Sequence, residues 1–156
     1  MKSTVVLLFS ILFLHISCKE AKQSDQPETE ATASPYQYPA LGNAELTSLF
    51  AVTEKVDMIF YNHPFSINQD DAKSAKNSVL YVTPAPVEIN KSCKPLGRLS
   101  WIADGKIIRE ADFYMDSVCR YFIFMTNNQP SAANAMSESG VSFFTNIFQQ
   151  VQQQQK

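Results

Sequence analysis

The sequence has few of the residues that catalytic and nucleotide-binding motifs require. Among 156 residues there are only four glycines, namely Gly42, Gly97, Gly105 and Gly140. They are too widely spaced to form a phosphate-binding loop or a dinucleotide-binding fingerprint. The serine-nucleophile motifs Gly-X-Ser-X-Gly and Ser-X-X-Lys are also missing. These absences favour a protein that binds without catalysing a reaction and that needs no cofactor.

A large excess of charge of one sign is missing as well. The chain has 13 Lys and Arg against 15 Asp and Glu, which gives a formal net charge of −2 at pH 7. Proteins that bind nucleic acid need a basic patch or stripe to neutralise phosphates. No such stripe occurs, so we expect no nucleic-acid partner.

Histidine is too scarce for an ordinary metal site. His63 is the only histidine after the first 18 residues, and no His-X-X-X-His or His-Glu-X-X-His motif occurs. The pair Asp70–Asp71 and the set Glu110, Asp112 and Asp116 could in principle bind a cation or transfer protons. A solvated strand face explains Glu110 and Asp112 better, and we expect no metal. A small hydrolase that uses His63 and nearby acids is an alternative.

The first 18 residues have the order of an export signal. Lys2 is followed by an apolar run from Val5 to Leu14, and small Ser17 comes directly before Cys18. The apolar run is shorter than the 20 or so residues that span a bilayer as a helix. The chain is therefore expected to be exported.

Residues Leu14 to Cys18 resemble the end of bacterial lipoprotein signals, in the loose form found in Bacteroidota, although His15 departs from that pattern. The resemblance implies that the signal comprises residues 1–18 and that Cys18 is lipidated, which anchors the protein to a membrane. Lys19-Glu20 resembles a surface-export signal of the same group, which implies the outer membrane but leaves its face open. An ordinary cleaved signal that releases a soluble protein is the alternative.

Cys93 and Cys119 remain after the signal. In an oxidising compartment an even pair predicts a disulfide, and the alternative is a metal-binding or nucleophilic cysteine. The two positions are 26 apart in the sequence. The chain-entropy model gives roughly 3.5 kcal/mol of stabilisation for a ring of that length.

The composition after Cys18 divides the chain into three parts. Residues 19–42 are rich in Gln, Glu, Ala, Ser, Thr and Pro and predict a flexible tether. Residues 43–153 predict a single domain, and the Gln-rich end at 154–156 is expected to fray.

The domain pattern predicts an α+β fold. It indicates an antiparallel sheet of about five or six strands, with an N-terminal and a C-terminal helix packed on it. The turn at Asp104-Gly105 is the strongest local signal. The expected helices cover 43–54 and 139–152, with Asn43 capping the first, and the expected strands cover 56–61, 78–83, 98–103, 106–115 and 118–125, with a further short strand possible at 65–68.

Three residues are candidates for a binding surface. Trp101 and Tyr114 suit half-exposed contacts, and His63 lies in a polar loop. The segment Asp116-Ser117-Val118 resembles the O-glycosylation acceptor of Bacteroidota, which would modify Ser117. The alternative is a strand-to-strand turn in which Asp116 bonds the local backbone.

Together these features predict an exported, lipid-anchored envelope protein that acts as a non-enzymatic binding or structural module. Its partners would be the membrane, through the anchor, and an envelope protein or glycan. The alternative is a carrier for a hydrophobic small ligand or a glycan, with a pocket between the sheet and the helices.

Metabolic labelling with a fatty-acid probe tests the anchor. We expect the wild-type chain to carry the label and the Cys18→Ala variant to lose it, because the lipid would be attached to that side chain. Equal labelling of the two chains, or none in either, would remove the anchor.

Overall fold

A computed structural model of the chain describes residues 37–154. In that part the helices are α1 (Asn43–Val52), α2 (Ala72–Val79) and α3 (Glu138–Gln154). The strands are β1 (Lys55–Phe60), β2 (Ser66–Gln69), β3 (Val82–Pro86), β4 (Gly97–Ala103), β5 (Lys106–Met115), β6 (Arg120–Thr126) and β7 (Gln129–Met136). No helix of the described residues is long and apolar enough to cross a membrane.

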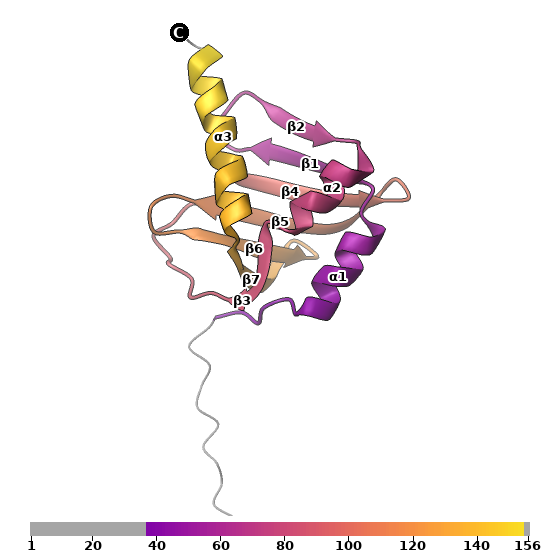
Figure 1. The fold of residues 1–156 in the computed structure, drawn as a ribbon. Coiled ribbons are helices and arrows are strands. Elements are labelled where there is room, and N and C mark those ends of the chain that lie inside the picture. The colour runs from indigo at the N-terminus through magenta and orange to yellow at the C-terminus, as the bar shows by residue number, and fades with distance from the viewer. Residues whose placement is uncertain (1–36, 155–156) are drawn as a thin grey trace, which may run out of the picture. The chain divides into compact units, whose positions relative to one another are not determined.

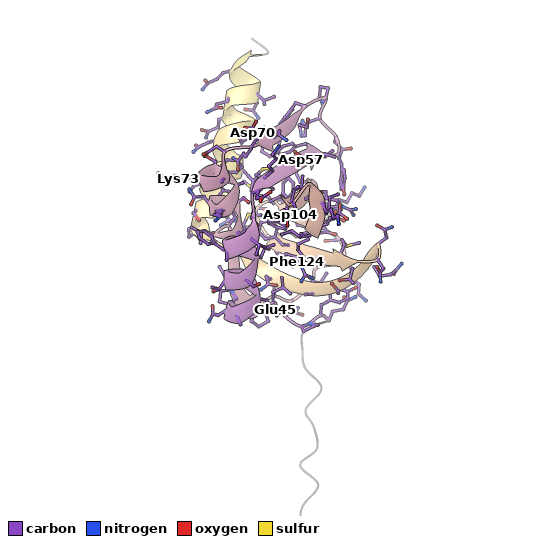
Figure 2. All side chains as sticks on the ribbon, turned by 90° about the vertical axis from the view of Figure 1, so that its right-hand side faces the viewer. Glu45, Asp57, Asp70, Lys73, Asp104 and Phe124 are labelled. Carbon is purple, nitrogen blue, oxygen red and sulfur yellow. A yellow bond between two sulfur atoms is a disulfide. The ribbon has the colours of Figure 1, made fainter. Side chains whose placement is uncertain are left out.

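The seven strands form a single sheet in the order β2-β1-β4-β5-β6-β7-β3, and every neighbouring pair is antiparallel (Figure 1). All three helices lie on one side of this sheet (Figures 1 and 2). The α+β class is therefore confirmed, while the sheet is larger than the expected five or six strands and a third helix is present.

Alternation along the strands gives the sheet one strongly apolar face. Val56 lies opposite Trp101, and Met58 lies opposite Leu99. The pattern continues across β5 and β6, where Phe113 lies opposite Phe122. Since side chains alternate between the two faces of a strand, all of these side chains point toward the helices. We call this side the helix face and the opposite side the outer face.

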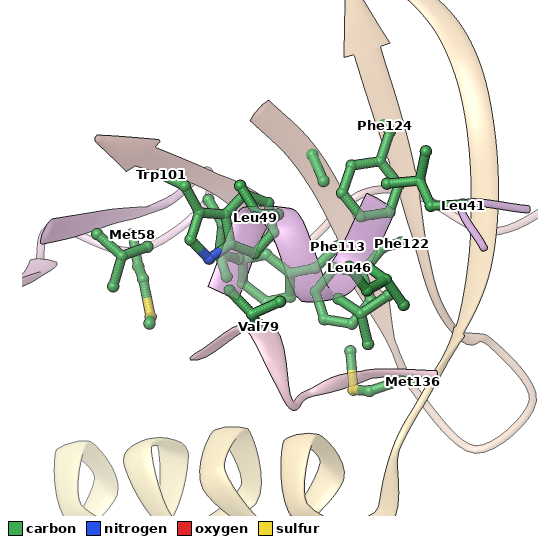
Figure 3. Close-up of a cluster of buried hydrophobic side chains, with 14 of the residues drawn as sticks. Leu41, Leu46, Leu49, Met58, Val79, Trp101, Phe113, Phe122, Phe124 and Met136 are labelled. Atoms are coloured by element: carbon green, nitrogen blue, oxygen red, sulfur yellow. The ribbon is translucent and has the colours of Figure 1, made fainter. Parts of the chain in front are cut away.

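The core on the helix face is built from aromatic rings (Figure 3). Phe144 of α3 is fully buried and stacks on Phe113, with 4.4 Å between the ring centroids. Trp101 is also fully buried, and its indole Nε1 donates a 2.7 Å hydrogen bond to Ser78 Oγ. The expectation that Trp101 is an exposed contact residue is therefore wrong, because Trp101 alternates onto the covered face of β4.

Caps and turns follow local sequence. The cap of α1 is Gly42 and not Asn43, and the Gly42 N–H donates to Glu45 Oε2 at 3.0 Å. Asp71 caps α2 by accepting from the Ser74 N–H at 2.9 Å. At the β4–β5 turn, Asp104 and Gly105 both have positive φ, 50° and 70°, as a two-residue hairpin requires.

The strand predicted at 78–83 is wrong in its first four residues. Ser78 and Val79 end α2, and β3 begins only at Val82. A short apolar run fits a buried helix end as well as a strand, so periodicity alone could not separate them. The helical turn is decided by the Asp71 cap and by burial of Ala75 and Val79 against the core.

The sequence pattern also missed β7. Its residues QPSAANAM have little strand propensity. Strand β7 is stabilised by pairing on both sides. It pairs with β6, where Tyr121 lies opposite Ala135 and Thr126 opposite Gln129, and with β3, where Val82 lies opposite Met136. Small alanines on this strand leave room for the segments that cover both of its faces.

The ordered domain begins before residue 43, so the tether predicted for 19–42 is too long. Leu41 is buried, and its backbone forms two hydrogen bonds with the side chain of Asn134. The Leu41 N–H donates to Asn134 Oδ1, and Asn134 Nδ2 donates to the Leu41 carbonyl, each at 2.9 Å. The Ala133 N–H donates to the Pro39 carbonyl at 2.8 Å. Cys18, residues 19–36 and residues 155–156 lie outside the described residues, while Gln154 is the last residue of α3.

Phe144→Ala tests how much the aromatic core contributes. We expect it to lower the free energy of unfolding by about 3–5 kcal/mol, because it opens a cavity against Phe113. Phe143→Ala is the matched control, since Phe143 is only partly buried and should cost clearly less. Urea denaturation measures both variants, and equal losses would show that the core does not depend on the Phe144 position.

Candidate functional site

The outer face of the sheet is divided into two halves. Over β6 and β7 it is covered by the loop at 87–96, which joins β3 to β4. Val87, Ile89 and Cys93 of that loop pack on Tyr121 and its neighbours, which are buried as a result. The apolar outer side of β6 therefore does not form an exposed surface.

The disulfide predicted between Cys93 and Cys119 is present, with 6.4 Å between the two Cα atoms. It ties the covering loop to the start of β6. The Tyr121 hydroxyl adds a hydrogen bond of 3.2 Å to the Asn90 carbonyl. The covering loop is thus fixed to the sheet by one covalent link and by hydrogen bonding.

Asp116 lies close to both cysteines, so the three groups have the proximity of a metal site. The sulfurs are joined to each other, however, and a disulfide offers no thiolate to a metal. Asp116 Oδ1 accepts the N–H groups of Val118 and Cys119, both at 2.7 Å. Asp116 therefore shapes a turn, as the alternative interpretation predicted, and Ser117 is exposed on that turn. Glycosylation of Ser117 stays a prediction.

The other half of the outer face, over β1, β4 and β5, is not covered by any described element. Ile59 is 54% exposed and Tyr61, just after β1, is 45% exposed. We define the open half-face by its seven central residues, which are Asp57, Ile59, Tyr61, Arg98, Ser100, Glu110 and Asp112. Glu110 and Asp112 share this face, as their spacing predicted.

Hydrogen bonds between strands order the acidic side chains of the open half-face. Asp112 Oδ1 accepts from Arg98 Nε and from the Tyr61 hydroxyl, both at 2.7 Å. Asp112 is only 15% exposed at its side chain, so it forms an ion pair and is not the freely solvated residue expected.

The two other acids each accept one donor. Ser100 Oγ donates to Glu110 Oε1 at 3.1 Å, and Asn68 Nδ2 donates to Asp57 Oδ1. Each acid is therefore held by a residue of a neighbouring strand.

Tyr61 and Arg98 keep their protons at neutral pH. Burial and, next, the hydrogen bond to Asp112 raise the pKa of Tyr61 to about 12. The hydrogen bond to Asp112 likewise raises the pKa of Arg98 above its ordinary value. A general acid or base works best with a pKa near the working pH. Tyr61 and Arg98 are therefore suited to positioning and charge pairing and not to proton transfer.

The three predicted surface residues do not form one surface. His63 lies at the β1–β2 turn on the helix face, with its ring 5.1 Å from that of Phe148 and 5.6 Å from that of Phe65. Glu110 and Asp112 lie on the outer face instead, away from His63.

Tyr114 lies on the outer face, at the border of the covered half. It stacks on Tyr121 at 4.6 Å, and burial raises its pKa to about 12. Sequence reasoning missed Ile59, Tyr61 and Arg98. Ile59 and Tyr61 could have been found from alternation in VDMIFY, where they occupy the phase opposite to Met58 and Phe60.

A hollow lies on the helix side of the sheet, between α1, the end of α2 and β3. It is an open groove of about 380 Å³, lined by Asn43, Leu46, Thr47, Phe50, Val79, Leu80, Val82 and Pro84. The pocket expected between sheet and helices does not form under α3, where the rings of Phe60, Phe113 and Phe144 fill the space.

Comparison of the chain with protein-family models, with curated proteins and with solved structures finds no match.

Replacing Asp112 tests the network. Asp112→Asn should lower the pKa of Tyr61, since it removes a negative charge beside the phenol, but the value should stay above the ordinary 10.0 because burial remains. Glu110→Gln is the control and should leave Tyr61 unchanged. NMR of ring-labelled tyrosine follows each titration.

The raised pKa of Tyr61 makes the stability of the folded chain depend on pH. The pKa of Tyr61 is higher in the folded chain than its ordinary 10.0. The neutral phenol therefore contributes its full stabilisation of the fold below pH 10, and this contribution is lost as the pH rises toward 12. Tyr61→Phe should flatten stability in that window. An unchanged slope in Tyr61→Phe would contradict the assigned role of the phenol.

Proposed function

We propose that this protein is an exported, lipid-anchored envelope protein that binds another envelope protein through the open half-face, without catalysis. The observation that carries this proposal is the unequal cover of the outer face. One half is sealed by a disulfide-fastened loop, and the other half exposes Ile59 and Tyr61 between ordered charged groups.

The composition of the open half-face suits a protein partner. Protein interfaces combine a few large apolar or aromatic anchors with a polar rim. Among the seven residues that define this half-face, Ile59 and Tyr61 are the exposed large apolar side chains. Asp57 precedes Ile59 by two residues on β1, and Arg98 lies directly opposite Ile59 on β4. The rim is therefore close enough to the anchors to exclude water around them in a complex.

The rigidity of the surface also favours binding. Tyr61 just after β1, Arg98 on β4 and Asp112 on β5 are held together by two hydrogen bonds of 2.7 Å. A side chain that is ordered before binding loses less conformational entropy in the complex.

Export and anchoring rest on the N-terminal signal and on the cysteine pair. The disulfide is typical of proteins that fold outside the reducing cytosol. The tether then runs from the anchor at Cys18 to the start of the domain.

A ligand carrier is the second candidate function. The groove between α1, α2 and β3 supports it, because its lining is mostly apolar and its volume of about 380 Å³ lies in the range of small-ligand sites. An alkyl or acyl group would suit that lining.

Site-specific photo-crosslinking in the native envelope separates the two candidates. A photo-reactive residue is placed at Ile59 on the open half-face, at Leu80 in the groove, or at Val52 on α1. These side chains have similar exposures of 54%, 55% and 49%, so Val52 is a matched control. We expect a protein adduct of discrete mass from position 59 alone.

Two other outcomes would overturn the protein-binding proposal. A small-molecule adduct from position 80 alone would favour the carrier, and the same pattern at positions 59 and 52 would show that the open half-face binds nothing specific. Once the partner is captured, Ile59→Ala should weaken its binding roughly tenfold, as expected for an interface anchor.

A further inference from the structure

We propose that β2 pairs with the β2 strand of a second copy of the chain. The sheet has two edge strands, β2 and β3 (Figure 1). Strand β3 contains Pro84 and Pro86, which lack the N–H that a further strand would need. Strand β2 has the sequence SINQ, and none of the described residues pairs with its outer edge. The available edge is therefore β2.

Strand β2 itself carries no charge, although Asp57 of β1 accepts a hydrogen bond from Asn68 and Asp70-Asp71 follow the strand. Residues 65–69 contain no acid or base, and neither do residues 139–154 of α3, whose Phe148 packs against Phe65 at 6.4 Å between ring centroids. Sheet edges that must stay unpaired are usually protected by charged residues, especially lysine. This edge lacks that protection.

Neutrality favours a second copy over a foreign strand. A two-fold axis sets the edge against an identical edge, so a net charge on β2 would meet the same net charge on the second copy. A strand from another protein could instead carry the opposite charge, and the edge would then be expected to be charged. The neutral edge is therefore suited to self-pairing.

Side-chain alternation limits the register. Ser66 and Asn68 pair with β1 residues of the outer face, while Ile67 pairs with Met58 of the helix face. Directly paired residues of antiparallel strands point to the same face. The two-fold axis must therefore lie midway between the two copies of one residue, so that this residue is opposite itself. One register places Ile67 opposite Ile67, with Ser66 opposite Asn68.

That register is favoured over the one centred on Asn68. It covers the half-buried, apolar Ile67 with its own copy, whereas Asn68 Nδ2 already donates to Asp57.

The pairing keeps the outer faces of both copies on one side. Since β1, β4 and β5 follow β2 in the sheet, the two open half-faces would lie on either side of the joined β2 strands. The pairing does not depend on what the open half-face binds, so it can fail without affecting the proposed function. Because β2 has only four residues, the dimer should be weak and concentration-dependent.

Sedimentation equilibrium of the full exported chain, with its disulfide intact and in density-matched detergent, tests the pairing. We expect wild type to pass from monomer to dimer as the concentration rises and to stop at the dimer. Ile67→Lys should stay monomeric, because it places two like charges opposite each other. Val52→Lys, a similar change on α1, should dimerise like wild type.

Two further measurements protect the test against misfolding. Circular dichroism checks the fold of each variant, and Ser66→Lys introduces a charge at an exposed β2 position without touching the core. It should also stay monomeric. A photo-reactive residue at position 67 should link to the β2 peptide of a second copy.

A wild type that stays monomeric, an Ile67→Lys or Ser66→Lys variant that dimerises like wild type, assembly beyond the dimer, or a link from position 67 to another segment or another protein would each overturn the proposal.

Discussion

The stacking of Phe144 on Phe113 is the contact on which most of the structure depends. Residue 144 is on the last helix, and Phe113 is on the middle strand of the sheet, so their contact joins α3 to the sheet at its centre. Phe60 packs edge-on against both rings and extends the cluster to β1. Because this apolar face must be covered, all three helices are drawn to one side, and the other side is left to loops and solvent.

The outer face of the sheet is covered in one half and exposed to solvent in the other. Over β6 it is apolar, and a loop fastened by the Cys93–Cys119 disulfide covers it. Over β1, β4 and β5 it needs no cover, because Arg98 and Asp112 pair with each other and Tyr61 donates to the same carboxylate. A surface that is ordered but not closed is what a binding module offers to a partner.

Local patterns predicted a large part of the fold. The hairpin at Asp104-Gly105, the strand at 118–125 and the helix at 139–152 were each indicated by signals within a few residues, and each is present with shifts of only a few residues. Strand β7 and helix α2 were missed, because alanines and a short apolar run become ordered only through their neighbours. The site was predicted less well. Glu110 and Asp112 were placed on one face, but Tyr61, which donates to Asp112, lies 51 residues earlier in the sequence.

The sequence by itself determined the hairpin turn at Asp104-Gly105, the cysteine pair and the strands with a clear apolar pattern, since these depend on backbone preferences and on counts along the chain. Only the tertiary structure decided which side of each strand is covered. Trp101 shows the reason: its amphipathic ring suits a half-exposed position, yet pairing with Val56 and bonding to Ser78 place it in the core. Strand order and helix placement, which are long-range choices, separate the buried face from the open half-face.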